Sequence, residues 1–320
     1  MQRRKVLLGL LAMGAATPMT GFAAELTGKI SGSAVVHTKE SMARAIEAAW
    51  VALPAAVTGS LVYEGILSKA PRAQARAATV VFVHGSGGIN PQIKAFQKWM
   101  AEELGIASVT LDSYQLPDRM TYSSPIAKSD YEKIHALRAS ELKATVAWLP
   151  EAGWFDGRFV IAGTSEGAVA VARYRRAASA PLERGRIIFS WSCEDNYHVE
   201  SARNAIPENM PVLNVMSATD KYFSKANSYL GNDAALGHCG RALAKNRFAS
   251  IVLIPEAPHT LLNLPQTHQV VEGFLKERLL NYGNTDPPPS ACPVQKGTGG
   301  EVRCPESVRL CASGTDTRRS

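Results

Sequence analysis

The stretch from residue 158 to residue 172 constrains the fold of this chain more than any other. It begins as an apolar run, passes through Gly163-Thr164-Ser165-Glu166-Gly167 and continues as a series of alanines and valines. The apolar run predicts a buried strand, and the alanine-rich continuation predicts a helix. A strand that turns directly into a helix would place Ser165 on a sharp corner, where the two glycines leave room for the elements to approach each other.

Ser165 is the predicted nucleophile at this corner. Its hydroxyl would be exposed at the N-terminus of a helix, where the helix dipole favours developing negative charge. The pattern G-x-S-x-G alone also occurs in ordinary Gly-Ser turns. The flanking strand and helix favour a nucleophile over such a turn.

The chain around this motif alternates short β-branched runs with longer helical patterns. This alternation is typical of an α/β domain with a mostly parallel central sheet and helices on both of its faces. The predicted strands are Ser60–Leu67, Thr79–His84, Ser108–Leu111, Arg158–Ala162, Ile187–Trp191, Pro211–Ser217 and Ser250–Pro255. The predicted helices are Lys39–Ala52, Pro91–Leu104, Asp130–Leu149, Glu166–Ala178 and Gln266–Leu280.

Composition and charge place one folded domain at about residues 25–284. With 46% hydrophobic and 20% charged residues, the chain is too apolar for a disordered protein and too charged for a polytopic membrane protein. The net charge of +7 is concentrated toward the ends, and the central part has no basic block. We therefore expect no nucleic-acid partner.

The two ends of the chain differ from its centre. Residues 1–23 combine Arg3, Arg4 and Lys5 with a short apolar run and small residues, a pattern typical of a signal peptide. The arginine pair also resembles a twin-arginine export signal, and an N-terminal core helix is the alternative. Residues 285–320 are rich in proline and glycine without periodicity, which predicts a disordered tail. We expect an exported protein, periplasmic or secreted, without stable membrane insertion after signal removal.

A second motif precedes the nucleophile. From Thr79 the sequence reads Thr-Val-Val-Phe-Val-His-Gly-Ser-Gly-Gly, which predicts a strand that ends in a glycine-rich turn. An oxyanion hole requires two N–H donors, and we predict those of Glu166 and of either Ser86 or Gly87. A phosphate-binding loop is the alternative, but neither G-x-x-x-x-G-K-[ST] nor G-x-G-x-x-G occurs here.

These two motifs, in this order, resemble those of the α/β-hydrolase superfamily over about residues 60–281. The elbow Gly-Thr-Ser-Glu-Gly-Ala is similar to that of the dienelactone-hydrolase-like branch. The resemblance implies an α/β-hydrolase fold and the chain order nucleophile, acid, histidine. Dienelactone hydrolases proper have a cysteine nucleophile, whereas this chain has Ser165 at that position.

That chain order narrows the choice of base and acid. His259 is the predicted base because it follows an apolar strand and precedes the last helix, where active sites of open α/β sheets assemble. Asp220 follows the preceding strand and is the predicted orienting acid. Glu194 and Asp195 are alternatives for the acid, and Asp220 could instead cap a helix.

Aromatic residues near these positions are candidates for substrate contact. We expect Tyr114, Trp191 and Tyr222 to line an acyl site, with residues 221–239 forming one of its walls. Aromatic residues at such positions equally suit a plain hydrophobic core.

The chain has five cysteines, which are Cys193, Cys239, Cys292, Cys304 and Cys311. They form no C-x-x-C pair and have no histidine at metal-ligand spacing, so we expect no metal site. Export permits disulfides, and Cys193 and Cys239 would both lie near the carboxyl edge of the sheet. We predict a bridge between them, with two unpaired buried cysteines as the alternative.

The sequence therefore predicts an exported serine hydrolase that cleaves carboxylic esters or lactones through an acyl-enzyme on Ser165, without a cofactor. The substrate would be a small-molecule or polymeric ester. Two alternatives stay open. One is a serine peptidase of the prolyl-oligopeptidase type, although no propeller-sized region precedes the domain. The other is a non-catalytic binding protein with the same fold.

Overall fold

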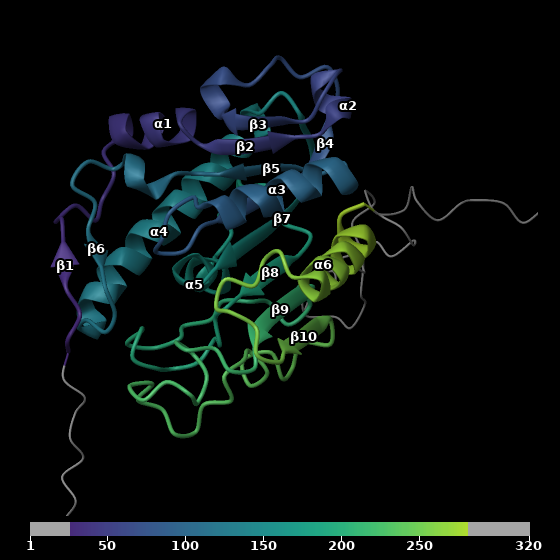
Figure 1. The fold of residues 1–320 in the computed structure, drawn as a ribbon. Coiled ribbons are helices and arrows are strands. Elements are labelled where there is room, and N and C mark those ends of the chain that lie inside the picture. Colours follow the sequence, from purple (N-terminus) through teal and green to yellow (C-terminus); the bar gives the residue numbers. More distant parts are fainter. Residues whose placement is uncertain (1–25, 281–320) are drawn as a thin grey trace, which may run out of the picture.

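An eight-stranded sheet runs through the protein, which is described by a computed structural model over residues 26–280 (Figure 1). The strand order is β3-β2-β5-β4-β7-β8-β9-β10. Strand β2 is antiparallel to both of its neighbours, and all other pairs in the sheet are parallel. A mostly parallel sheet with its second strand reversed, in which β5-β4-β7-β8-β9-β10 follow that strand, is the architecture of the α/β-hydrolase fold, so the predicted fold class is confirmed.

The elements have the following bounds. The strands of the large sheet are β2 (Trp50–Leu53), β3 (Tyr63–Ile66), β4 (Ala77–Val83), β5 (Ala107–Thr110), β7 (Phe155–Thr164), β8 (Arg186–Phe189), β9 (Val212–Ser217) and β10 (Ala249–Ile254). A separate small sheet pairs β1 (Ile30–Ser31) with β6 (Thr121–Tyr122). The α-helices are α1 (Lys39–Glu47), α2 (Ala55–Thr58), α3 (Pro91–Glu103), α4 (Lys128–Trp148), α5 (Glu166–Arg173) and α6 (Pro265–Arg278). The 3₁₀ turns are η1 (Leu67–Lys69), η2 (Ser113–Gln115) and η3 (Leu149–Glu151).

Helices cover the sheet on both faces, as predicted. Helices α3 and α6 pack on one face, and α4 and α5 pack on the other (Figure 1). Strand β4 serves both layers, because Val80 and Phe82 join the core under α3 while Val81 and Val83 join the core under α4 and α5. Full burial of each such side chain stabilises the fold by about 1.5–3 kcal/mol. Such strands read as continuous apolar runs, which explains why β4 could be predicted.

Local signals in the sequence begin the helices. The Thr38 hydroxyl accepts a hydrogen bond from the Ser41 N–H at the start of α1, and Asn90 Oδ1 accepts one from the Ile93 N–H at the start of α3. Each bond satisfies an N–H that has no partner within its helix. Proline stands at the first position of α3 and α6, where its missing N–H costs nothing.

Most predicted boundaries differ from the observed ones by a few residues, and three of these differences have a clear physical cause. The helix predicted over Lys39–Ala52 ends at Glu47, because residues 50–53 form β2 and pair with β3 and β5. Sheet pairing overrides the helix propensity of this alanine-rich stretch. The helix predicted to reach Ala178 ends at Arg173, since Tyr174 adopts a ψ of 129° and buries its ring. The strand predicted to reach Trp191 ends at Phe189, because Ser190 has a φ of 52°.

Some expectations lie partly or wholly outside the described residues. The predicted signal peptide at residues 1–23 and the tail at residues 285–320 are both outside.

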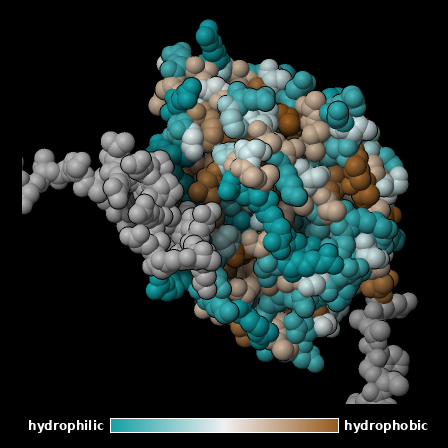
Figure 2. All heavy atoms as spheres, turned by 180° about the vertical axis from the view of Figure 1, so that it is seen from behind, coloured by the Kyte–Doolittle hydropathy of each residue, from teal (hydrophilic) through white to brown (hydrophobic). Residues whose placement is uncertain are grey.

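Between residues 26 and 280, no helix has the length and apolar character needed to cross a bilayer. The face seen in Figure 2 is largely hydrophilic, with hydrophobic residues scattered over it.

Strands β4 and β7 and helix α5 meet most closely at the glycines of the elbow. A Cβ atom on Gly167 would lie 2.2 Å from the Val83 carbonyl oxygen and 2.6 Å from that of His84. A Cβ on Gly163 would lie 2.7 Å from the Gly167 oxygen. Backbone atoms cannot move aside as a flexible side chain can, so glycine is required at both positions.

We predict opposite effects for two glycine-to-alanine changes. Gly167→Ala should destabilise the protein by at least about 2 kcal/mol, because the new methyl group overlaps the end of β4. Gly273→Ala, in the exposed interior of α6, where the new methyl would meet nothing within 4 Å except the nearby backbone of its own helix, should stabilise it by about 0.5–1 kcal/mol. Urea unfolding followed by circular dichroism measures both. Wild-type stability of Gly167→Ala would contradict the close approach.

Candidate active site

Ser165 occupies the sharp corner between β7 and α5. Its backbone has a φ of 54° and a ψ of −119°, a strained conformation for a residue with a side chain. Its N–H donates to the Phe189 carbonyl at 3.0 Å, which ties the corner to the end of β8. The predicted strand-to-helix elbow is therefore present, and strain of this kind is typical of functional residues.

A cavity of about 580 Å³ opens over Ser165. This volume is within the usual range for small-molecule sites. Its polar side is the turn of residues 85–88, together with Ser165 and His259. Its aromatic side comes from several segments, and the aromatic rings that line it are those of Tyr122, Tyr197, His198, Tyr222, Phe223 and Tyr229.

Asp220 and His259 form a hydrogen-bonded pair beside this cavity. Asp220 Oδ2 lies 2.7 Å from His259 Nδ1; the carboxylate is fully buried, and the imidazole is 14% exposed. The other carboxylate oxygen accepts the N–H groups of Tyr222 at 2.8 Å and Phe223 at 3.0 Å. Because a carboxylate oxygen accepts hydrogen bonds, the proton of this bond is assigned to His259 Nδ1, which leaves Nε2 as the candidate acceptor nitrogen.

The backbone and the ring of His259 each have a further contact. The Ser190 hydroxyl donates to the His259 carbonyl at 2.5 Å, and the Tyr222 ring packs edge-on against the imidazole with centroids 4.5 Å apart. Within the described residues, no hydrogen bond joins the side chains of Ser165 and His259, although both line the cavity. Such bonds are often long in unliganded sites and shorten when substrate binds.

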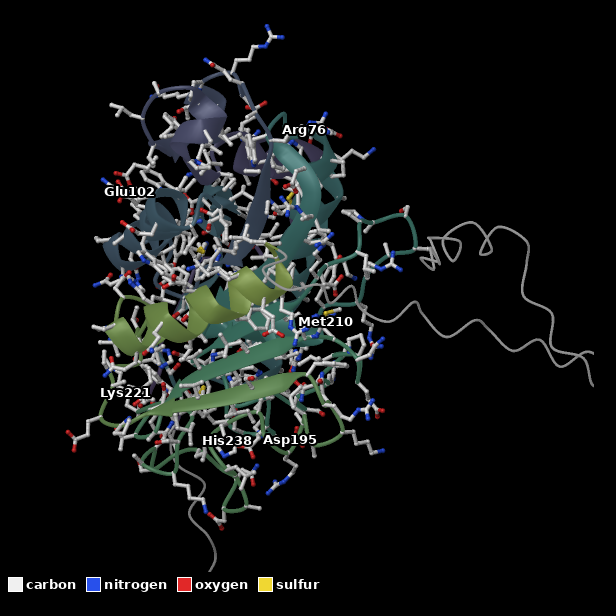
Figure 3. All side chains as sticks on the ribbon, turned by 90° about the vertical axis from the view of Figure 1, so that its right-hand side faces the viewer. Arg76, Glu102, Asp195, Met210, Lys221 and His238 are labelled. Carbon is white, nitrogen blue, oxygen red and sulfur yellow. A yellow bond between two sulfur atoms is a disulfide. The ribbon has the colours of Figure 1, made fainter. Side chains whose placement is uncertain are left out.

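The alternative acids contact other groups. The Glu194 carboxylate accepts the N–H groups of Leu236 and Gly237, and Asp195 Oδ1 accepts that of Ala202. In Figure 3, the labelled Asp195, Lys221 and His238 all lie on the coil beside the β10 end of the sheet. Of the three carboxylates considered, the structure brings Asp220 against His259.

The glycine-rich turn lies against the elbow. A Cβ on Gly85 would be only 3.3 Å from the Ser165 Cβ. The N–H groups of Ser86, Gly87 and Glu166 make no hydrogen bond in the described part of the chain, and all three residues adjoin Ser165 or the cavity. Free N–H groups beside a nucleophile are what an oxyanion hole requires.

The three predicted substrate contacts have different positions. Tyr222 lines the cavity and touches His259. Trp191 requires correction, because it is fully buried in the core against Phe223 and does not line the cavity. Tyr114 also lies outside the cavity lining; its hydroxyl donates to the Ser86 carbonyl instead.

Part of the cavity wall carries no signal in the sequence. Residues 221–239 do contribute to it, as expected, through Lys221, Tyr222, Phe223 and Tyr229. Tyr122 and His198 were not predicted. His198 lies in an irregular segment and Tyr122 in a strand of only two residues, so no periodic pattern marked either one.

A disulfide joins Cys193 to Cys239, as predicted, with 4.8 Å between the Cα atoms. It connects the coil between β8 and β9 to the coil between β9 and β10, and the enclosed chain includes Asp220. Both coils also contribute residues to the cavity wall. The bridge therefore restrains the segment that carries the acid.

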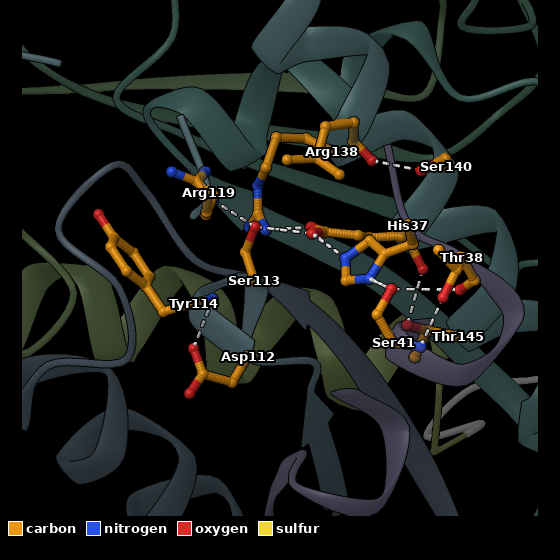
Figure 4. A network of polar contacts seen from close by, with 12 residues as sticks. His37, Thr38, Ser41, Asp112, Ser113, Tyr114, Arg119, Arg138, Ser140 and Thr145 are labelled. Carbon is orange, nitrogen blue, oxygen red and sulfur yellow. Dashed lines mark hydrogen bonds and ion pairs between the residues drawn. The ribbon is translucent and has the colours of Figure 1, made fainter. Parts of the chain in front are cut away.

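A network of buried charged residues lies beneath the elbow and the glycine-rich turn (Figure 4). Glu166 Oε1 accepts from Arg119 at 2.8 Å and lies 3.3 Å from Arg138 Nε. Arg138 also pairs with Glu141 and donates to the His84 carbonyl at 2.8 Å. Arg119 Nε donates to the Ser113 hydroxyl, which itself donates to Glu141 Oε1 at 2.6 Å. A charge in a predicted helix usually faces solvent, so the sequence did not indicate this network.

Burial and charge together shift the pKa values in this network. Burial alone would raise the pKa of Glu141, but the Arg138 guanidinium, His37 and Ser113 outweigh it and lower the pKa to about 2. Burial, and then the charge of Arg138, lowers the pKa of His84 well below its usual value. His84 is therefore neutral; its Nε2 accepts the Ser113 N–H, and its Nδ1 donates to the Gly85 carbonyl at 2.6 Å.

No cluster of three or more histidine, cysteine, aspartate or glutamate side chains suited to a metal ion occurs between residues 26 and 280.

Comparison with known proteins gives distant structural likenesses. No family model matches the sequence, and no curated protein matches it. A protein from Klebsiella pneumoniae subsp. pneumoniae named as a dienelactone hydrolase is 17% identical, with a TM-score of 0.46 over 66% of this chain and 90% of its own. A serine hydrolase without a lid from Xanthomonas campestris is 15% identical, with a TM-score of 0.44 over 75% of this chain and 90% of its own.

An esterase from Thermogutta terrifontis is 14% identical, with a TM-score of 0.42 over 73% of this chain and 89% of its own. Strand order and the geometry of the elbow, rather than these likenesses, define the fold of the chain.

We predict that Glu141 stabilises the protein in a pH-dependent way. Its folded pKa of about 2 lies below the ordinary value of 4.5, so its contribution is complete above about pH 5 and is lost as the pH falls toward 2. Glu141→Gln should cost about 3 kcal/mol at pH 7 and about half of that at pH 3. Urea unfolding at both pH values measures the difference.

A matched control is Glu103→Gln, at the exposed end of α3, which should keep wild-type stability at both pH values. A cost for Glu141→Gln that does not change with pH would contradict an ionised carboxylate as its cause.

Proposed function

We propose that this protein is a serine hydrolase that cleaves carboxylic esters or lactones, with Ser165 as nucleophile, His259 as base and Asp220 as orienting acid. One arrangement carries the proposal. A serine on a strained strand-to-helix corner and a histidine bonded to a buried aspartate border the same cavity, next to N–H groups without partners. This combination suits acyl transfer, because it supplies a nucleophile, a base and a site for negative charge.

In the first half of the proposed reaction, Ser165 Oγ attacks the ester carbonyl carbon while His259 Nε2 takes the hydroxyl proton. The buried Asp220 carboxylate stabilises the resulting imidazolium through Nδ1. Negative charge on the former carbonyl oxygen is stabilised by the N–H of Glu166 and that of Ser86 or Gly87. Collapse of the tetrahedral intermediate breaks the ester bond, and His259 returns its proton to the leaving alcohol.

In the second half, water replaces the alcohol. His259 Nε2 takes a proton from the water as its oxygen attacks the acyl carbon, and the same N–H groups stabilise the second oxyanion. Release of Ser165 with the proton from His259 yields the carboxylic acid and the free enzyme. One ester and one water thus give one acid and one alcohol, and the cycle uses no cofactor.

The cavity suits an ester with an apolar portion, because aromatic rings from several segments form one side of its wall, opposite the glycine-rich turn and the candidate catalytic residues. We propose either a small-molecule or a polymeric ester as substrate. Export to the periplasm or the medium is part of the proposal; the N-terminal pattern and the Cys193–Cys239 disulfide support it.

The first test is replacement of the nucleophile. Ser165→Ala should lower kcat for p-nitrophenyl esters by about 10⁶-fold without loss of folding, since the side chain lies at a cavity. A fluorophosphonate should label the wild-type protein at Ser165 and leave the variant unlabelled. Wild-type turnover by the variant would exclude Ser165 as nucleophile.

Substrate panels separate this proposal from its two alternatives. Turnover of peptides in preference to p-nitrophenyl esters of graded chain length would favour the peptidase alternative. A wild-type protein that neither turns over esters nor reacts with the fluorophosphonate would favour a non-catalytic binding protein.

The second test concerns the acid. Asp220→Asn should lower kcat by about 10⁴-fold, because the amide can hold the His259 ring with the proton on the wrong nitrogen. Asp195→Asn is the matched control, since this carboxylate bonds a backbone N–H away from His259 and should leave kcat near the wild-type value. A large loss in the control with little loss in Asp220→Asn would move the acid to the earlier segment.

A further inference from the structure

The glycine-rich turn of residues 85–88 requires outside support if its N–H groups are to keep fixed directions. Three of its four residues are glycines, which have the widest conformational freedom of all residues. Two carbonyl groups of this turn are held by side chains. His84 Nδ1 donates to the Gly85 carbonyl at 2.6 Å, and the Tyr114 hydroxyl donates to the Ser86 carbonyl at 2.5 Å.

Holding a carbonyl also orients the next N–H group. In a planar trans peptide, the C=O of one residue and the N–H of the following residue point in opposite directions. The His84 ring therefore fixes the direction of the Ser86 N–H, and the Tyr114 hydroxyl fixes that of the Gly87 N–H. These two N–H groups are the candidates for one arm of the oxyanion hole.

Both supports originate from one short element, η2. The Ser113 N–H donates to His84 Nε2 at 3.1 Å, and the adjacent Tyr114 reaches Ser86. A Cβ on Gly88 would lie 3.2 Å from the Tyr114 ring, so this ring packs against the turn. A tyrosine hydroxyl is protonated at neutral pH and can donate there, and burial of part of the ring raises the pKa of Tyr114 further.

Tyr114 is also connected to the other arm of the hole. The Arg119 guanidinium lies 4.8 Å from the centre of the Tyr114 ring and donates to the Glu166 carboxylate at 2.8 Å. Glu166 supplies the other predicted N–H donor. The Tyr114 ring therefore packs against Arg119, and Arg119 in turn holds the Glu166 side chain at the elbow.

We infer that Tyr114 is a positioning residue that orients the Ser86–Gly87 peptide for oxyanion stabilisation. The inference rests on the proposed function and goes beyond it, because Tyr114 lies outside the cavity lining and acts through the turn. Its hydroxyl should therefore matter more for the charged transition state than for the bound ester.

Tyr114→Phe tests the inference, because it removes one oxygen from a ring that is 42% exposed and so should fold normally. Deletion of one oxyanion donor costs about 10²–10³-fold in kcat, so loss of its support should cost less. We expect kcat for p-nitrophenyl acetate to fall about tenfold with KM unchanged. The inhibition constant of phenylboronic acid, which forms a tetrahedral adduct with the nucleophile, should rise by a similar factor.

Tyr63→Phe is the matched control. The Tyr63 hydroxyl also donates to a backbone carbonyl, that of Ile66 at 2.9 Å, on the edge strand β3. This variant should keep the wild-type kcat, KM and inhibition constant, and both variants should keep the wild-type Tm within a few degrees.

The outcomes separate the inference from the proposed function. If the wild-type enzyme turns over the ester and Tyr114→Phe has the same kcat and inhibition constant, the inference is overturned while the proposed function stands. A rise in KM alone would also overturn it, because that result indicates a substrate contact. If the wild-type protein neither turns over esters nor reacts with a fluorophosphonate, the proposed function fails and the inference fails with it.

Discussion

The buried carboxylate of Glu166 requires positively charged partners, and those partners also hold the elbow and the glycine-rich turn together. An unpaired charge with no exposed surface would cost several kcal/mol. Arg119 and Arg138 approach Glu166 from two sides, and Arg138 in turn requires Glu141. Because Arg138 also holds the His84 carbonyl, the same charges fix the distance between the elbow and the glycine-rich turn. Removing any one of the four would leave its buried partners with less compensating charge.

This network also explains how the chain can maintain strain at Ser165. A positive φ at a serine persists only where the surrounding structure leaves no relaxed alternative. Below the corner, Gly167 is packed against the carbonyl oxygens of Val83 and His84, and Glu166 is held by two arginines. Rotation of the corner toward a relaxed conformation would break these contacts. The rigidity that makes Ser165 available thus comes from neighbours that take no part in the proposed reaction.

The parts of the site that sequence could predict are those with fixed local geometry. Gly163 and Gly167 imply a close approach wherever they flank a serine between a strand and a helix, and His259 follows a strand that reads as apolar. Contacts between distant segments carry no such signal. The bond between Tyr114 and Ser86 and the burial of Trp191 depend on how separate loops fold over one another. The strand β2 was missed for the same reason, since only its neighbours in the sheet distinguish it from the end of a helix.

Much of the cavity wall is irregular coil, whereas Ser165 lies between a strand and a helix. Residues 190–211 and 218–248 contain no helix or strand, and the Cys193–Cys239 bridge joins them into one unit. Coil of this kind is not paired with the strands of the sheet, so a change in its length does not shift their alignment. Lengthening it also costs little loop-closure entropy. Insertions and deletions there can reshape the entrance while β4, β7 and α5 stay as they are. The proposed nucleophile thus lies between β7 and α5, whereas the coil forms the surface that would select the substrate. A protein with this architecture could therefore change its substrate while keeping its fold.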